Sequence, residues 1–248
     1  MTTEPPDLTV RCRRPILAVR FREPQRLLSW SISHPGFVEA DAVAWLEVRD
    51  ADLPIGVDPR ALLREKLAAA GLARAVGLMT ACDVRSRRTL AVTVEDVTAT
   101  VVTTVGLGNG EFVGRRRHAV EPWAPSPPET INTLVHVSRQ LRDEALIETI
   151  AIAAQARTLA VLEATLRRGG DVLTGTGSDC IVVASPRGDG LPHAGLHTAV
   201  GEAVGAAVLE ATRGAAACWL MEARKALHAR RGGDAETKAR SDLADLPS

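Results

Sequence analysis

The order of strand-like and helix-like segments is the feature that most limits what this chain can fold into. Short β-branched or aromatic stretches bounded by Pro, Gly and Asp predict strands, mostly in the first half. They are residues 16–21, 27–32, 42–48, 75–80, 89–94, 97–105, 131–137 and 181–184. Two long apolar segments, about 139–168 and 197–228, predict helices in the second half. This order favours an α+β fold, with a mixed or antiparallel sheet and long helices packed on one face.

Helix signals support this division. Asp58 suits an N-cap and Pro59 a first helical position, which predicts a short helix there. The segment 139–168 is apolar on most of its circumference, so we expect a buried helix. In the last helix Gly201 and Gly205 fall on one face and allow close packing against another backbone.

We expect a single domain over residues 1–248, because no boundary divides the chain. Segments 1–8 and 230–248 show little periodicity and are expected to be flexible tails. The segment 106–128 is rich in Gly, Pro and charge and is interpreted as a loop. Its basic run at 115–118 is interpreted as a solvated surface, with contact to an anion or a partner as the alternative.

Composition excludes several classes of function. The chain carries 30 basic and 30 acidic residues, so its formal net charge is zero, and nucleic acid or an anionic membrane is not an expected partner. Hydrophobic residues make up 46% but aromatic residues only 3%, so Ala, Val and Leu must fill the core. Four widely spaced cysteines suggest neither a disulfide framework nor a zinc site. The N-terminus does not resemble a signal peptide, and we expect a cytoplasmic protein.

A glycine-spaced bend followed by an apolar strand concentrates reactive groups. Glycine permits tight turns and close approach of a ligand to the backbone. The bend consists of Thr174, Gly175, Thr176, Gly177, Ser178, Asp179 and Cys180. His197 and Thr198 follow at the start of the last predicted helix. This density of hydroxyl, carboxylate, thiol and imidazole groups predicts a site built around one cavity.

Each of these residues also has a purely structural interpretation. Asp179 can hold the turn by accepting backbone N–H groups, and Cys180 can be a small buried hydrophobe. Thr198 can cap the helix that follows it. The glycines and threonines of the bend can also cradle a phosphate, although no Gly-Lys-Ser/Thr sequence follows them.

Two catalytic arrangements suit the cluster. In the first, Ser178, Cys180 or a threonine hydroxyl is a nucleophile activated by a histidine. In the second, Asp179 and His197 position a water molecule, directly or through a metal, although we assign no metal ligands. His197 is the expected proton-transfer group in both, because its ordinary pKa lies near neutrality. Backbone N–H groups of the bend are expected to stabilise an oxyanion.

Four segments together resemble the adenosylcobinamide amidohydrolase family of prokaryotic cobamide-salvage enzymes. They are residues 174–184, 194–205, 77–81 and 131–133, within a similarity that spans roughly residues 25 to 212. The family usually has Thr where this chain has Ser178 and Leu196. An acidic-Ala-Lys stretch of the family is Gln155-Ala156-Arg157 here, which bears on substrate preference and activity.

The resemblance implies hydrolysis of the amide that joins the propionyl side chain of the corrin to aminopropanol. The corrinoid is then the substrate, no cofactor is implied, and the chain is expected to be a bacterial enzyme. Both a monomer and a homo-oligomer stay open. Substrate contacts are expected from the bend, from Thr198, and from Met79, Thr80 and Asn132 in the matching segments. A wide cleft is expected, edged by Trp30, Met79 and Trp123.

Two alternatives stay open at this level. One is a corrinoid- or nucleotide-binding protein that has lost turnover, which the changes at Gln155 and Arg157 favour. The other is an unrelated acyl-transfer or N-terminal-nucleophile-like enzyme with a similar glycine turn.

Overall fold

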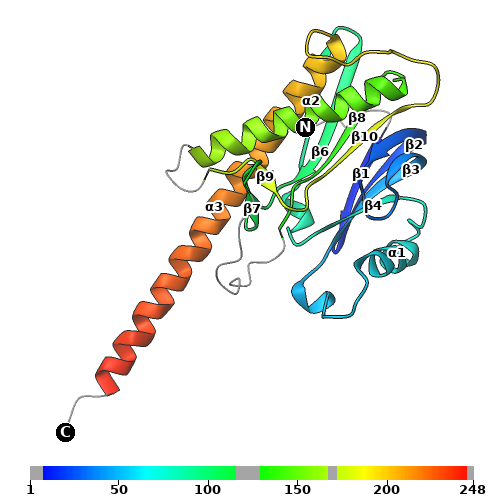
Figure 1. Ribbon diagram of the computed structural model, residues 1–248. Coiled ribbons are helices and arrows are strands. Elements are labelled where there is room, and N and C mark those ends of the chain that lie inside the picture. Colours follow the sequence, from blue (N-terminus) through cyan, green and yellow to red (C-terminus); the bar gives the residue numbers. More distant parts are fainter. Residues whose placement is uncertain (1–7, 116–128, 167–171, 245–248) are drawn as a thin grey trace.

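A mixed β-sheet forms the centre of the molecule (Figure 1). The structure, a computed structural model, describes residues 8–115, 129–166 and 172–244, with only the backbone described for residue 224 and residues 226–244. Within these ranges the sheet has eight strands in the order β4-β3-β2-β10-β8-β6-β5, with β1 paired to β2. Its strands are β1 (Leu8–Arg13), β2 (Ile16–Ser29), β3 (Gly36–Glu47), β4 (Val76–Thr80), β5 (Arg88–Val94), β6 (Val97–Thr104), β8 (Asn132–Val137) and β10 (Cys180–Pro186).

The remaining elements of the described ranges are three α-helices, two short strands and two 3-10 turns. The helices are α1 (Pro59–Ala69), α2 (Asp143–Leu166) and α3 (Ala199–Ala244). The strands β7 (Gly110–Glu111) and β9 (Gly175–Thr176) pair with each other, and the 3-10 turns are η1 (Asp50–Asp52) and η2 (Val84–Ser86). Strands β3/β4 and β8/β10 are parallel pairs and the others are antiparallel, so the α+β class and the mixed sheet are confirmed.

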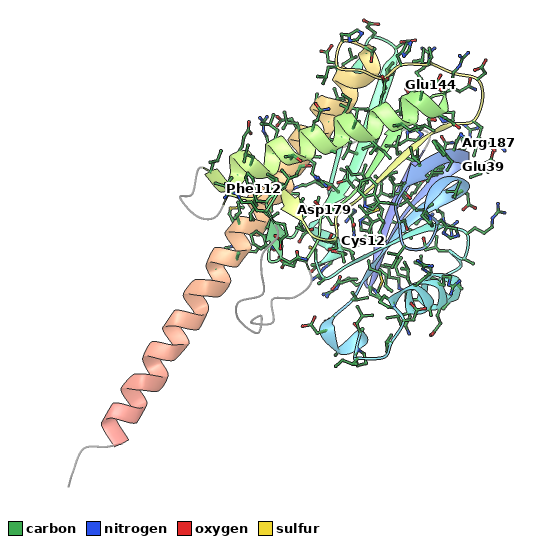
Figure 2. The ribbon with its side chains drawn as sticks, viewed as in Figure 1. Cys12, Glu39, Phe112, Glu144, Asp179 and Arg187 are labelled. Atoms are coloured by element: carbon green, nitrogen blue, oxygen red, sulfur yellow. The ribbon has the colours of Figure 1, made fainter. Side chains whose placement is uncertain are left out.

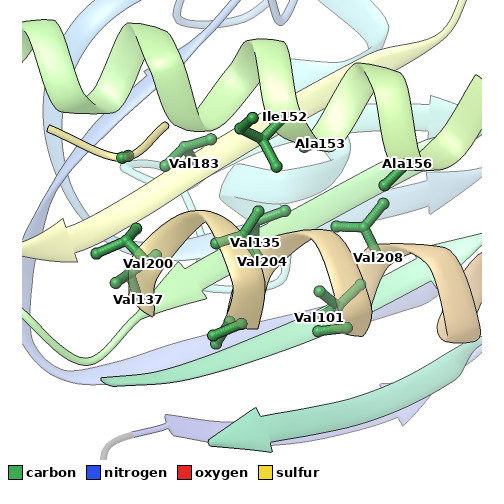
Figure 3. Packing of buried hydrophobic residues seen from close by; sticks show 14 of the residues in the cluster. Val101, Val135, Val137, Ile152, Ala153, Ala156, Val183, Val200, Val204 and Val208 are labelled. Atoms are coloured by element: carbon green, nitrogen blue, oxygen red, sulfur yellow. The ribbon is translucent and has the colours of Figure 1, made fainter. Parts of the chain in front are cut away.

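The two long helices cover one face of the sheet. Alternating strand residues such as Val101, Val135 and Val183 point toward α2 and α3, because successive side chains of a strand face opposite sides. They pack against Ile152 of α2 and Val204 of α3 (Figure 3). The predicted packing of long helices on one face is therefore confirmed.

Side chains on the other face of the sheet form a second apolar core. Val102, Leu134 and Val182 point into it, together with Val19 and Trp45 from β2 and β3. Strands from β4 to β6 in the sheet order thus share one cluster. Helix α1 packs separately on the outer side of β3 and β4.

Helix α2 is less enclosed than its composition suggests. It is long and apolar enough to cross a membrane, yet it packs against α3 and β10. Its outer face exposes Ile147, Leu159 and Leu166. The expected burial of this helix is therefore confirmed on the side that packs against α3 and β10 and wrong on the outer face.

Three boundaries also differ from the predictions. Residues 16–21 and 27–32 belong largely to one strand, β2, with a register shift between Arg20 and Gln25 that accommodates Pro24. The tail predicted over residues 1–8 is wrong at Leu8, which begins β1, and residues 1–7 lie outside the described residues. The helical backbone of α3 continues to Ala244, so the irregular tail predicted from 230 was wrong up to that residue.

The two glycines of α3 predict opposite responses to substitution by alanine. A Cβ at Gly201 would overlap the carbonyl oxygen of Gly195, whereas a Cβ at Gly205 would lie 3.7 Å from Ile152 in ordinary contact. We expect Gly201→Ala to lower the free energy of unfolding by more than about 2 kcal/mol. Gly205→Ala is expected to be neutral or to stabilise by up to about 1 kcal/mol through helix propensity. Urea unfolding of both variants tests this, and equal stabilities would contradict it.

Candidate active site

A cavity of about 370 Å³ opens where β4 ends and where β8 and β10 begin. Its wall includes three of the predicted substrate contacts, Met79, Thr80 and Asn132. The bend contributes Gly177, Ser178, Asp179 and Cys180. Cys180 and Asn132 are paired in neighbouring parallel strands, so the register of the sheet brings the two segments together. Trp30 also lines the cavity, as expected, whereas Trp123 lies outside the described residues.

The carboxylate of Asp179 holds the bend in place. One carboxylate oxygen pairs with Arg157 Nη1 at 2.8 Å and accepts the backbone N–H of Thr176 at 3.0 Å. The other oxygen accepts the backbone N–H of Ile131 at 3.1 Å and a short hydrogen bond from the Thr176 hydroxyl. These four donors match the acceptor capacity of a carboxylate. Asp179 is therefore engaged in holding the turn, as its structural interpretation proposed.

The ion pair with Asp179 is almost buried, since the two side chains are only 15% (Arg157) and 7% (Asp179) exposed. A Cβ at Gly175 would come within 2.6 Å of Asp179 Oδ2, so glycine allows the carboxylate its position. Gln155, the other departure from the family pattern, is exposed and does not line the cavity. Residue 157 thus keeps a positive charge, as arginine in place of lysine. It pairs with Asp179 and does not itself line the cavity.

Ser178 lies at the tip of the bend, exposed and facing the cavity. In the part of the chain that the structure describes, neither its hydroxyl nor the backbone N–H groups of Ser178 and Asp179 have a hydrogen-bond partner. The bend itself is held from the other side, because Trp30 Nε1 donates to the carbonyl oxygen of Asp179 at 2.6 Å. A hydroxyl and two N–H donors are therefore presented together on a rigid turn.

Cys180 is a poor candidate for the nucleophile. It is 6% exposed and belongs to the apolar core below the cavity. Burial raises the pKa of its thiol from 9.0 to about 12, with a smaller raising effect from the charge of Asp179. The thiolate is the reactive form of cysteine, so this group is unreactive near neutrality. Of the two competing nucleophiles, Ser178 is the one that the geometry favours.

A polar part of the cavity wall beside the bend is made by Asn132, Thr80 and Thr130. The side-chain amide of Asn132 donates to the carbonyl oxygen of Met79 at 2.7 Å, which joins β8 to β4 across the cavity floor. Thr80 accepts the backbone N–H of Cys82 at 3.1 Å. Thr130 receives a weak contact from the Thr176 hydroxyl at 3.4 Å. These contacts fix the wall but leave it polar.

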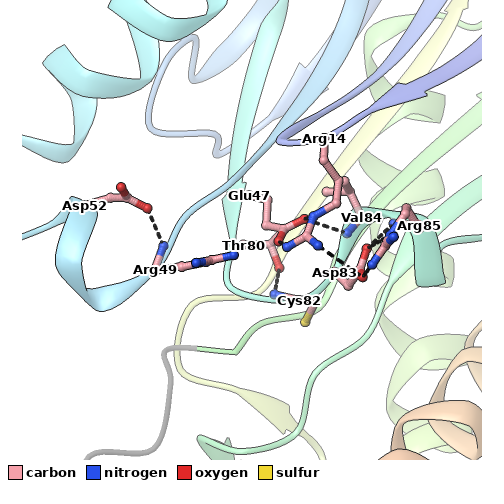
Figure 4. Close-up of polar contacts among 9 residues, drawn as sticks. All are labelled: Arg14, Glu47, Arg49, Asp52, Thr80, Cys82, Asp83, Val84 and Arg85. Atoms are coloured by element: carbon pink, nitrogen blue, oxygen red, sulfur yellow. Dashed lines mark hydrogen bonds and ion pairs between the residues drawn. The ribbon is translucent and has the colours of Figure 1, made fainter.

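A group of ion pairs holds the segment that follows Thr80 (Figure 4). Glu47 pairs with Arg14 and accepts the backbone N–H of Val84 at 3.2 Å. Asp83 binds Arg85, and this hydrogen bonding lowers the pKa of its carboxyl to about 2. These contacts anchor the end of β4, and with it Thr80, from outside the cavity.

His197 and Thr198 are not part of this cavity. Asp179 contacts Arg157 of α2, whereas the backbone N–H of Ala194 donates to the Glu148 carboxylate of the same helix. Arg157 and Glu148 are nine residues apart, which is about 13 Å along the helix axis. Asp179 and Arg187 mark the two ends of β10 in Figure 2, and the segment that carries His197 follows the far end. The prediction that this imidazole and the bend share one cavity was therefore wrong, because a whole strand separates them.

Thr198 instead caps α3, as its structural interpretation proposed. Its hydroxyl donates to the carbonyl oxygen of Gly195 at 2.8 Å and accepts the backbone N–H of Gly201 at 3.0 Å. Thr174 is also structural, since its hydroxyl accepts the backbone N–H of Val113 at 2.7 Å. Thr174, Gly175 and Thr176 lie behind the cavity wall and not in it.

Sequence reasoning missed other cavity residues. Ser31, Ile32 and Thr130 line the cavity, and Ser31 is almost fully buried. A signal for Ser31 existed in the alternation of Ser29, Ser31 and Ser33 across the end of the strand predicted over residues 27–32. In the described ranges, no three His, Cys, Asp or Glu side chains come together as metal ligands would. Residues 116–118 of the basic run lie outside those ranges.

Comparison with known proteins identifies the family. A sequence model described as adenosylcobinamide amidohydrolase matches residues 2–223. The chain belongs to this family. A protein of that name from Halobacterium salinarum is 42% identical over 89 residues, which are 36% of this chain and 36% of that protein. This chain thus matches about a third of the length of its curated relative, whose archaeal source says nothing of the expected bacterial origin.

Two solved structures are distantly similar to this amidohydrolase family member. The PH0078 protein from Pyrococcus horikoshii OT3 matches with 12% identity and a TM-score of 0.45, covering 84% of this chain and 82% of that one. A β-aminopeptidase from Burkholderia sp. matches with 15% identity and a TM-score of 0.41, covering 81% and 78%. Likenesses this distant say nothing about the chemistry of this chain.

The Arg157–Asp179 pair predicts a stability effect that depends on charge. We expect Arg157→Met to lower the free energy of unfolding by about 3 kcal/mol, because it leaves a buried carboxylate unpaired. Arg157→Lys keeps the charge and is expected to cost less. The exposed Gln155→Ala should stay within about 0.5 kcal/mol of wild type. Urea unfolding measures all three, and a methionine variant as stable as wild type would contradict the role of the pair.

The raised pKa of Cys180 predicts slow alkylation in the folded protein. At pH 8 its thiol is expected to stay protonated and to react with iodoacetamide at least about 10-fold more slowly than in urea. Peptide mass spectrometry measures this. The unfolded thiol ionises near its ordinary pKa of 9.0, whereas the folded thiol stays protonated to higher pH. The free energy of unfolding that this difference contributes is therefore fully present below pH 9.0 and declines as the pH rises toward 12. Equal alkylation rates in the two states would contradict the assignment.

Proposed function

We propose that this protein hydrolyses the amide bond between aminopropanol and the corrin propionyl side chain of adenosylcobinamide, which releases adenosylcobyric acid for corrinoid salvage. The observation that carries the proposal is that segments 77–81, 131–133 and 174–184 of a family member meet at one cavity. The bend at that cavity carries a hydroxyl and two backbone N–H groups that have no partner among the described residues. Amide hydrolysis requires such an attacking group and such an oxyanion site.

The size of the cavity supports binding of one arm of the substrate. Its volume of about 370 Å³ lies at the small end of the range for ligand pockets, roughly 300–1,000 Å³. The aminopropanol arm fits such a space, whereas the whole macrocycle must remain at the mouth. Trp30 and Ile32 line this cavity and are 46% and 41% exposed, so they offer the macrocycle an apolar surface.

In the proposed reaction, Ser178 Oγ attacks the amide carbonyl carbon. The N–H groups of Ser178 and Asp179 hold the oxyanion that forms. The C–N bond then breaks, and the proton lost by the hydroxyl leaves on the amine of aminopropanol. Water hydrolyses the resulting ester, which regenerates Ser178 and gives the carboxylic acid. The reaction consumes one water for each amide.

A corrinoid-binding protein without turnover is the second candidate. The departures at residues 155 and 157 were the features that favoured it. Gln155 lies away from the cavity, and Arg157 keeps the ion pair with Asp179, so neither departure removes a group from the cavity wall. We therefore favour the enzyme.

Incubation with adenosylcobinamide tests the proposal directly. Wild-type protein is expected to release adenosylcobyric acid and aminopropanol, detected by mass spectrometry. Ser178→Ala should lower kcat by at least about 100-fold, because the nucleophile is lost. Ser178→Thr keeps the hydroxyl and should retain most activity. Tight binding by wild type without release would support the second candidate, and full activity of the alanine variant would remove Ser178 from the mechanism.

A further inference from the structure

The proposed reaction needs a group that takes a proton from the attacking hydroxyl and returns it to the leaving amine. The groups first expected to do this are unsuited to it. The Asp179 carboxylate is occupied by four donors, His197 follows the far end of β10, and the thiol of Cys180 stays protonated.

A different imidazole reaches the cavity wall through two hydroxyl groups. His34 Nδ1 lies 3.0 Å from Ser33 Oγ, and Ser33 Oγ lies 3.0 Å from Ser31 Oγ. Ser31 is 2% exposed and lines the same cavity as Ser178. Two successive hydrogen-bond distances therefore lead from a half-buried imidazole to Ser31, in the wall of the cavity that Ser178 also lines.

The two serines also have a structural role that explains their own presence. Ser33 Oγ accepts the backbone N–H of Gly77 at 2.7 Å, and Ser31 Oγ donates to the carbonyl oxygen of Gly77 at 2.5 Å. These bonds satisfy the outer edge of β4, and they do not depend on which side chain follows Ser33. The imidazole of His34 is thus not needed to hold the strand.

We propose that His34 is the proton acceptor and donor of this site, acting through Ser33 and Ser31. The inference rests on the proposed function. As Ser178 attacks, its proton crosses the cavity through a water molecule to Ser31 Oγ, the Ser31 proton passes to Ser33 Oγ, and the Ser33 proton passes to His34 Nδ1. The Ser31 hydroxyl turns away from the Gly77 carbonyl during this step. The reverse sequence delivers a proton to the departing amine, so no proton is gained or lost by the enzyme.

Substitution of His34 separates this role from a structural one. The described hydrogen bond of its side chain goes only to Ser33, and its backbone carbonyl, which accepts from Ser29 Oγ at 3.3 Å, remains in any variant. His34→Ala should therefore fold. We expect it to lower kcat for adenosylcobinamide by about 100-fold or more, the usual size of acid–base catalysis. The dissociation constant for adenosylcobinamide should change by less than about 3-fold, since His34 does not line the cavity.

Added imidazole provides the decisive readout. It should restore at least about 10-fold of the lost rate to His34→Ala, because it replaces the missing base, and should restore none to Ser178→Ala. His193→Ala removes an exposed imidazole from the segment after β10 and serves as the matched control, with wild-type kcat expected.

The two proposals fail in different ways. An active wild type with an unchanged kcat in His34→Ala, or a slow variant that imidazole does not rescue, would overturn the relay alone. A wild type that binds adenosylcobinamide but releases no product would overturn the proposed function, and the relay with it.

Discussion

The carboxylate of Asp179 is the contact on which the arrangement of the site depends. It links the cation of α2, the start of β8 and the backbone of β9 through Arg157, Ile131 and Thr176. A buried carboxylate is costly unless it is paired and fully hydrogen-bonded, and here both conditions are met. Because its donors come from three separate elements, the bend keeps its shape only when those elements are in their places.

This arrangement separates structural and chemical roles along four consecutive residues. Asp179 points back into the protein and holds the turn, while Cys180 begins the strand and enters the apolar core. Gly177 and Ser178 are left exposed at the tip. A residue that reacts must be accessible, and a residue that positions must be immobile, so neighbours in the chain divide these tasks.

Local patterns in the sequence predicted the fold class, the short helix and most strands. The cavity was indicated by the family resemblance, because its segments around Met79, Asn132 and Ser178 meet at the cavity wall. The prediction for His197 was wrong because separation along the sequence does not give distance in space. His197 follows Asp179 by eighteen positions, and a strand runs between them. His34 escaped notice because its relation to the cavity depends on the contact of Ser31 and Ser33 with Gly77 of β4, which no local pattern reveals.

The hydrogen bonds at Gly77 cover part of the exposed edge of β4. Strand β4 is the last strand on its side of the sheet, and such strands present unpaired backbone groups that can recruit another chain. At Gly77 both groups are occupied by Ser31 and Ser33. A foreign strand that tried to extend the sheet there would first have to displace these hydroxyls, so the rim of the cavity is also protected against unwanted self-association.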